Sequence, residues 1–189
     1  MRLILASASP RRAELLASAG FEFDVVPAEV DETGRPGEPP DVYALRVARE
    51  KAARVAVDRG TKGGIVLAAD TVVVAGHRTM GKPASDADAE SMLRQLSGAV
   101  HDVLTAIVLR SGARELEEVV ATRVHVVPLT DDEIRWYIES GEPFGKAGAY
   151  AIQGRAARFI DRIEGSWSNV VGLPLAVVHR LVAELGNGD

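Results

Sequence analysis

The chain opens with the stretch Met1-Arg-Leu-Ile-Leu-Ala-Ser-Ala-Ser-Pro-Arg-Arg-Ala-Glu-Leu-Leu-Ala-Ser18, which predicts a strand, a tight turn and a helix. Leu3 to Leu5 are typical of a short buried strand. Ser9 is a candidate helix cap, Pro10 suits the first helical position, and Gly20 ends the helix. A strand that passes directly into a helix is the first unit of an α/β fold.

The turn between this strand and helix favours a bound anion. Its free backbone N–H groups and the positive end of the helix dipole point to one spot. The hydroxyls of Ser7 and Ser9 and the side chains of Arg11 and Arg12 add hydrogen-bond donors and positive charge there. The alternative is a well-capped helix with two solvated arginines, and this stretch alone does not decide between the two.

Composition bounds the class of protein. The 189 residues suffice for a single domain, with room for two lobes around a cleft, and no apolar run is long enough to cross a bilayer. A net charge of −5 argues against sequence-independent binding to nucleic acid. The chain has no cysteine and its start lacks the pattern of a secretory signal, so we expect a soluble, cytoplasmic protein without disulfides.

The rest of the chain alternates strands with helices and carries one long glycine-dense loop, at 141–154. We expect strands at 21–26, 65–74, 100–109, 119–127 and 157–164, helices at 41–60, 85–96, 130–141 and 173–185, and a polar turn at 165–169. One hairpin interrupts the alternation, which predicts an α/β protein with a mixed sheet.

Asp70 is the anomaly of the sequence, because it is the single carboxylate in the apolar run 65–74. A carboxylate inside a buried strand needs a cation, a metal ion or a hydrogen-bond network. Together with Glu32, from the Pro/Gly-rich loop 27–39, it can bind one divalent cation such as magnesium, with water and phosphate completing the coordination. The alternatives are an aspartate bonded to neighbouring backbone and a solvated glutamate.

Four basic residues flank glycine, proline or helix signals and can converge at one end of the sheet, where open α/β sheets bind ligands: Arg11, Arg12, Lys51 and Lys82. Taken singly, each is typical of a solvated surface charge. His101 has no second histidine at metal-ligand spacing, which is typical of a structural residue. The residues alone therefore predict a phosphate-ester site with a metal.

A series of short motifs carries a resemblance to a known family: Ser7-Ala-Ser-Pro-Arg-Arg12, Val30-Asp-Glu-Thr33, Glu50-Lys51-Ala52, Ala69-Asp-Thr-Val-Val73, Gly81-Lys-Pro83, Leu96-Ser-Gly98 with His101, Lys146-Ala-Gly-Ala-Tyr-Ala-Ile-Gln-Gly154, and the segment from Ser166 to Pro174. In order and spacing they resemble the Maf family of nucleoside triphosphate pyrophosphatases over nearly the whole chain. The resemblance implies an elongated mixed β-sheet flanked by helices, related to inosine triphosphatases. It also implies a cytoplasmic, metal-dependent enzyme that cleaves a nucleotide between its α and β phosphates.

The resemblance further assigns roles to single residues. It makes Asp70 the proton acceptor. The family positions that match Arg12, Thr71 and Gln153 separate a branch acting on dTTP and UTP from one acting on 7-methyl-GTP, and this sequence resembles the dTTP/UTP branch. The amide of Gln153 offers one donor and one acceptor, which suits the O4 and N3–H edge of the pyrimidine. CTP and modified pyrimidine nucleotides are further candidate substrates.

The combined hypothesis is a magnesium or manganese ion held by Asp70 and Glu32 that bridges the phosphates of a nucleoside triphosphate. Ser7 and Ser9 bind phosphate together with the four basic residues, which also neutralise the departing pyrophosphate. Two alternatives stay open: a nucleotide-sensing module linked to septum formation, and a phosphatase that releases orthophosphate. We expect neither nucleic acid nor membrane as a partner, and a homodimer is compatible with the sequence.

Overall fold

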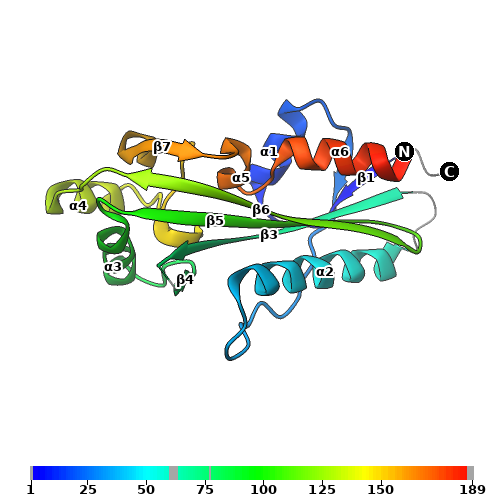
Figure 1. Cartoon of the computed structure of the whole chain (residues 1–189), viewed down its shortest axis with the longest axis horizontal. Helices are drawn as coiled ribbons and strands as arrows, with labels where there is room; N and C mark the ends of the chain where they lie inside the picture. The colour runs from blue at the N-terminus through cyan, green and yellow to red at the C-terminus, as the bar shows by residue number, and fades with distance from the viewer. Residues whose placement is uncertain (1, 60–63, 77, 187–189) are drawn as a thin grey trace. The chain divides into compact units, whose positions relative to one another are not determined.

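The computed structural model describes residues 2–59, 64–76 and 78–186. Seven strands form one sheet with the hydrogen-bonded order β2-β1-β3-β5-β6-β7, and β4 pairs with β3 off this path. Parallel and antiparallel pairs both occur, so the predicted α/β protein with a mixed sheet flanked by helices is confirmed (Figure 1). Within the described ranges, no helix is both long and apolar enough to cross a membrane.

The internal contacts of the chain group into two compact units. The first unit comprises Met1–Asp70, Thr105–Val120 and Gly172–Asp189, and the second comprises Thr71–Leu104 and Ala121–Val171. The long strands β3 (Gly64–Ala75), β5 (Val100–Ser111) and β6 (Arg114–Val126) contribute residues to both units.

The first unit contains, besides its parts of the long strands, β1 (Arg2–Leu5), α1 (Pro10–Ser18), β2 (Phe23–Val25), α2 (Pro40–Arg59) and α6 (Leu175–Gly186). Strand β1 runs parallel to β2 and to β3, with Leu5 opposite Leu67 in the β3 pairing. Helices α1 and α6 cover one face of this part of the sheet and α2 covers the other (Figure 1). Gly60, the predicted end of the second helix, lies outside the described residues.

Strand β3 is buried without interruption from Ile65 to Asp70. Helices cover both faces of the sheet here, which explains why the strand is apolar throughout instead of alternating. The predicted central strand is confirmed, and Asp70 lies inside it with only 8% of its surface exposed. The fold therefore holds a carboxylate in its core.

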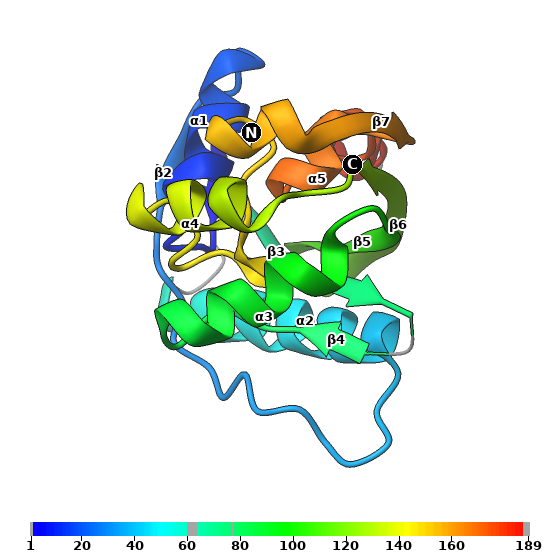
Figure 2. The ribbon, with the colours of Figure 1, turned by 90° about the vertical axis from the view of Figure 1, so that its left-hand side faces the viewer.

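The second unit adds β4 (Arg78–Met80), α3 (Asp86–Leu96), α4 (Asp131–Glu139), the 3-10 helices η1 (Ala147–Ala149) and η2 (Arg155–Phe159), β7 (Ile160–Glu164) and α5 (Trp167–Val171). Strands β4 and β7 run antiparallel to β3 and β6. Helix α3 packs against α4 and η1, in the region seen end-on in Figure 2. The predicted helix starts are confirmed, since Ser85 caps α3 and Thr130 forms a reciprocal capping box with Glu133 at α4.

Two predicted elements of the second unit are wrong. The polar turn expected at 165–169 is helix α5, because the hydroxyl of Ser166 accepts a hydrogen bond from the Asn169 N–H and so acts as a cap. Residues expected to begin a strand at 157 instead form η2, and the strand itself starts at Ile160. The short strand β4 was not predicted.

Candidate functional site

The β1–α1 junction is closed by a buried arginine. Arg12 is 8% exposed, and its guanidinium donates to the Ser7 hydroxyl at 3.1 Å, to the Ala69 carbonyl at 2.8 Å and to the Gly172 carbonyl at 2.8 Å. Ser7 follows the end of β1, Ala69 lies in β3, and Gly172 lies in the segment before α6. Arg12 therefore ties together three segments of the first unit that are distant in sequence.

The helix cap at this junction differs from the prediction. Pro10 is the first residue of α1, as expected, but the Ser9 side chain makes no capping hydrogen bond among the described residues. The Ser9 backbone N–H donates instead to the hydroxyl of Ser7, at 3.2 Å. Ser7 thereby serves both the turn and Arg12, and the Ser9 hydroxyl does not close the helix end.

Burial lowers the pKa of Arg12, the nearby Asp70 and Glu32 carboxylates raise it, and Arg11 lowers it further. A guanidinium stays charged throughout the physiological pH range even when it is buried. Arg12 therefore adds a permanent positive charge close to Asp70, and Arg11 lies near enough to increase the local positive potential.

Lys51, Asp70 and Glu32 form a charged cluster in the first unit. The Lys51 ammonium lies 2.8 Å from Asp70 Oδ1 and 2.7 Å from Glu32 Oε1. Lys51 and Asp70 are 7% and 8% exposed, whereas the Glu32 side chain is 45% exposed. The sequence predicted Glu32 and Asp70 as a metal-binding pair and Lys51 as a phosphate-binding residue, but not that the lysine would bridge the two carboxylates.

Burial raises the pKa of Asp70, while the charge and hydrogen bond of Lys51, and then the charge of Arg12, act to lower it. The neighbouring Glu32 carboxylate adds a small increase. The balance is a pKa above the ordinary aspartate value, so Asp70 holds a proton more firmly than an exposed aspartate does. A carboxylate of this kind is suited to accept a proton from water in a reaction.

The donor set near Lys51 fits a divalent cation that shares its coordination with a substrate. Over the residues that the structure describes, no group of three or more histidine, aspartate or glutamate side chains is arranged to hold a metal ion. Glu32 and Asp70 nevertheless turn their oxygens to one positive charge, that of Lys51. Magnesium commonly binds through one or two carboxylates, waters and substrate phosphates, which matches two carboxylates and not a closed protein cage.

Three predicted site residues belong to the second unit: Thr71, Lys82 and Gln153. Lys82 and Gln153 are exposed. Their segments are adjacent, because the Gly148 N–H of the glycine-dense loop donates to the Gly81 carbonyl at 3.0 Å. Thr71 follows Asp70 on β3, and successive side chains of a strand point to opposite faces.

The loop 141–154 is held by groups that sequence reasoning missed. The fully buried Tyr137 accepts from the Ala151 N–H at 3.2 Å and donates to Glu142 Oε1 at 2.9 Å. The other Glu142 oxygen accepts from the Arg155 N–H at 2.9 Å. Burial acts to raise the pKa of Glu142, but these hydrogen bonds lower it overall. The backbone is thus fixed on both sides of Gln153.

His101 supports the same loop from β5. Its Nε2 lies 2.8 Å from the hydroxyl of Tyr150, and the two rings meet edge to face with centroids 5.3 Å apart. His101 is 2% exposed, and its Nδ1 has no hydrogen-bond partner among the described residues. Burial lowers the pKa of His101 to about 4, so the ring is neutral at physiological pH. The prediction of a structural histidine agrees with this burial.

The fold is that of an α/β protein, and three charged side chains lie buried near the carboxyl end of β1: Arg12, Lys51 and Asp70. The chain belongs to the Maf family: the family model, described as Maf-like protein, matches residues 2–185. It is 53% identical over 189 residues to a protein of Anaeromyxobacter dehalogenans named dTTP/UTP pyrophosphatase, covering 98% of this chain and 94% of that protein. A protein of Geobacter sulfurreducens with the same name is 50% identical over 187 residues, covering 98% and 97%.

A solved structure shares the fold. It is described as the structure of the Staphylococcus aureus Ham1 protein, with a TM-score of 0.54 and 12% sequence identity, and the match covers 97% of this chain and 99% of that one. At this identity the likeness concerns the fold alone.

Proposed function

We propose that this chain hydrolyses dTTP and UTP to the nucleoside monophosphate and pyrophosphate. The observation that carries the proposal is the name dTTP/UTP pyrophosphatase, which relatives about half identical over nearly the whole chain share. The Lys51, Asp70 and Glu32 cluster supports it, because it combines a buried carboxylate of raised pKa with positive charge.

In the proposed reaction, a water oxygen bonds to the α-phosphorus while the bond from that phosphorus to the α–β bridging oxygen breaks. The electron pair of the broken bond leaves with pyrophosphate. Asp70 takes the proton of the attacking water, and Lys51 keeps the carboxylate ionised before the reaction. Positive charge from Arg11, Lys51 and Lys82 stabilises the triphosphate and the departing pyrophosphate.

A magnesium or manganese ion held by Glu32 and Asp70 would neutralise and orient the phosphates of the substrate. Because a two-carboxylate site leaves most coordination positions to other ligands, we expect the free protein to bind the metal weakly but measurably, and the nucleotide to make this binding tight. Removal of the metal with a chelator should therefore abolish turnover.

Gln153 is the proposed reader of the pyrimidine edge, together with Thr71. Its exposed side chain and the fixed backbone around it suit contact with a base. The proposed specificity role of Arg12 is indirect, since its guanidinium donates to Ser7, Ala69 and Gly172 and so shapes the junction. CTP and modified pyrimidine nucleotides are secondary candidate substrates.

The test is incubation of the purified full chain with magnesium and, separately, with UTP, dTTP, CTP, ATP and 7-methyl-GTP, followed by ion-exchange chromatography of the products. The expected result is equal amounts of monophosphate and pyrophosphate, fastest from UTP and dTTP. Binding without turnover would identify a nucleotide-sensing module instead. Release of orthophosphate as the first product would identify a phosphatase.

A further inference from the structure

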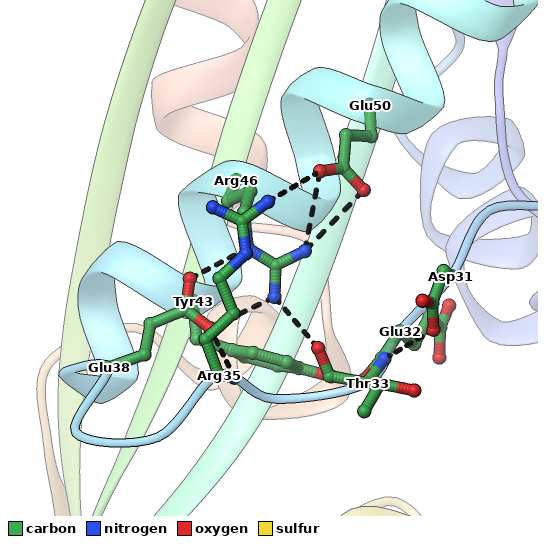
Figure 3. A network of polar contacts seen from close by, with 8 residues as sticks. All are labelled: Asp31, Glu32, Thr33, Arg35, Glu38, Tyr43, Arg46 and Glu50. Atoms are coloured by element: carbon green, nitrogen blue, oxygen red, sulfur yellow. Dashed lines mark hydrogen bonds and ion pairs between the residues drawn. The ribbon is translucent and has the colours of Figure 1, made fainter.

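The loop that carries Glu32 is attached to helix α2 by side chains outside the charged cluster. It joins β2 to α2 and has no helix or strand of its own (Figure 2). Tyr43 of α2 donates its hydroxyl proton to the Glu32 carbonyl at 2.8 Å, and Arg46 Nη2 donates to the Thr33 carbonyl at 3.0 Å (Figure 3). Two consecutive loop carbonyls are thus fixed to one face of the helix.

Arg46 is itself held in place by a second residue of the loop. Its Nε and Nη2 donate to the two carboxylate oxygens of Glu38 at 2.7 and 2.9 Å, and its Nη1 lies 3.3 Å from Glu50 Oε1 (Figure 3). The side chains of Arg46 and Glu38 are 14% and 8% exposed. A two-point arginine–carboxylate pair shielded from water has a defined geometry and is stronger than a single exposed ion pair. The apolar face of this helix, from Leu45 to Val55, predicts that Arg46 faces water, and the structure corrects that prediction.

The ion pair with Lys51 fixes the Glu32 side chain only weakly. That side chain is 45% exposed, and an ion pair with one partner in water contributes little to stability. Ordering even one backbone residue has an opposing cost in conformational entropy of at least similar size. The pair with Lys51 alone is therefore too weak to hold a loop residue at a metal-binding position.

We propose that Arg46 and Tyr43 are positioning residues that set the Glu32 carboxylate against Lys51 and Asp70 for binding of a divalent cation. The inference rests on the metal role given to Glu32 in the proposed function. It adds two residues of α2 that touch neither the phosphates nor the metal and act through the loop backbone. Groups of this kind commonly change metal affinity by about 10- to 100-fold when removed.

Helix α2 supplies a matched control for Arg46. One turn further along, Arg49 also pairs with a glutamate through two nitrogens, with Nε 2.6 Å from Glu117 Oε2. Glu117 lies on β6, so this pair ties α2 to the sheet and not to the loop. Arg49→Met removes an arginine–glutamate pair of the same form without touching the loop that carries Glu32.

The experiment measures Mn²⁺ binding to the nucleotide-free protein by electron paramagnetic resonance, for the wild type, Arg46→Met, Tyr43→Phe and Arg49→Met. The Mn²⁺ dissociation constant is expected to rise about 10-fold in Arg46→Met, about 3-fold in Tyr43→Phe and by less than a factor of 2 in Arg49→Met. Hydrogen exchange of the amides in 30–34 should speed up in the first two variants only. Tyr43→Phe removes a single hydroxyl, so it keeps the test decisive even where Arg46→Met folds poorly.

The same variants in a Glu32→Gln background separate positioning from general stability. If Arg46 acts through Glu32, Arg46→Met should change the Mn²⁺ dissociation constant little once Glu32 has lost its charge. Three results would overturn the inference. Arg46→Met could weaken Mn²⁺ binding as much in the Glu32→Gln background as in the wild type, Arg49→Met could weaken it as much as Arg46→Met does, or the wild type could bind no Mn²⁺. Release of pyrophosphate from UTP is measured separately, so failure of the proposed function is distinguished from failure of the positioning role.

Discussion

The charged cluster of the first unit and the loop 141–154 of the second unit fix their functional groups in opposite ways. In the cluster, Lys51 and Asp70 are buried and touch each other, so the charge of Lys51 acts directly on the pKa of Asp70. In the loop, Gln153 is exposed, and buried groups such as Tyr137 and His101 fix the backbone around it. Under the proposed function, breaking of the phosphate bond depends on the first region and the choice of base on the second.

Replacement of Asp70 by asparagine should have the largest effect. The variant keeps the shape of the side chain and an oxygen for Lys51, but it cannot accept the proton of the attacking water. We expect kcat for UTP to fall by about 10²- to 10⁴-fold, measured as pyrophosphate release at saturating magnesium. Asp102→Asn is the control, because Asp102 is a half-exposed aspartate of β5 whose pairing is with Arg123. Near-normal turnover in a folded Asp70→Asn protein would remove the chemistry from this cluster.

The second region should respond to acid through His101. Its pKa is about 4 in the folded protein and about 6.5 in an unfolded chain, so the unfolded chain takes up the proton first as the pH falls. The stability that comes from the neutral ring is present above pH 6.5 and declines toward pH 4, by about 1.6 kcal/mol between pH 6.5 and 5. Urea unfolding of wild type and His101→Gln at both pH values measures this difference. An equal pH dependence of the two proteins would show that His101 does not titrate as its burial requires.

The smallest of these effects concerns the choice of base. Gln153→Glu keeps the side-chain length but replaces the amide donor with a second acceptor, which then faces the O4 oxygen of uracil. Cytosine has an amino donor at the same position, so CTP should suffer less. The ratio of kcat/KM for UTP over CTP is expected to fall by about tenfold or more. A hydrogen bond that involves a charged group, such as the one between the carboxylate introduced by Gln153→Glu and the cytosine amino group, contributes about 1.5–3 kcal/mol. An unchanged ratio would mean that Gln153 does not contact the base.

The elements that the sequence predicted well are those set by local pattern. The apolar run around Asp70 predicts a buried central strand because burial on both faces removes the alternation that a half-exposed strand shows. Thr130 and Glu133 lie three residues apart, so their capping box is readable directly. The residue types and their positions predicted Glu32 and Asp70 as a metal-binding pair and Lys51 as a basic residue at the same end of the sheet, and the family resemblance added the proton-acceptor role of Asp70.

The residues that were missed depend on partners outside their own helix, strand or turn. Arg46 follows a helical pattern that assigns it to solvent, and only the return of the loop places Glu38 against it. In the sequence, Glu142 resembles a solvated loop carboxylate. In the structure, its carboxylate accepts a hydrogen bond from the Arg155 N–H, 13 residues later. Polar contacts of this kind leave no periodic signal, because they depend on how a loop closes and not on which face of an element a residue occupies.

The most direct test of the central claim is hydrolysis of UTP in ¹⁸O-labelled water, with the products analysed by mass spectrometry. If water activated by Asp70 attacks the α-phosphorus, one ¹⁸O atom enters each UMP and the pyrophosphate stays unlabelled. Label in the pyrophosphate would show attack at the β-phosphorus, and labelled orthophosphate would show cleavage at the terminal phosphate. Either result would contradict the account.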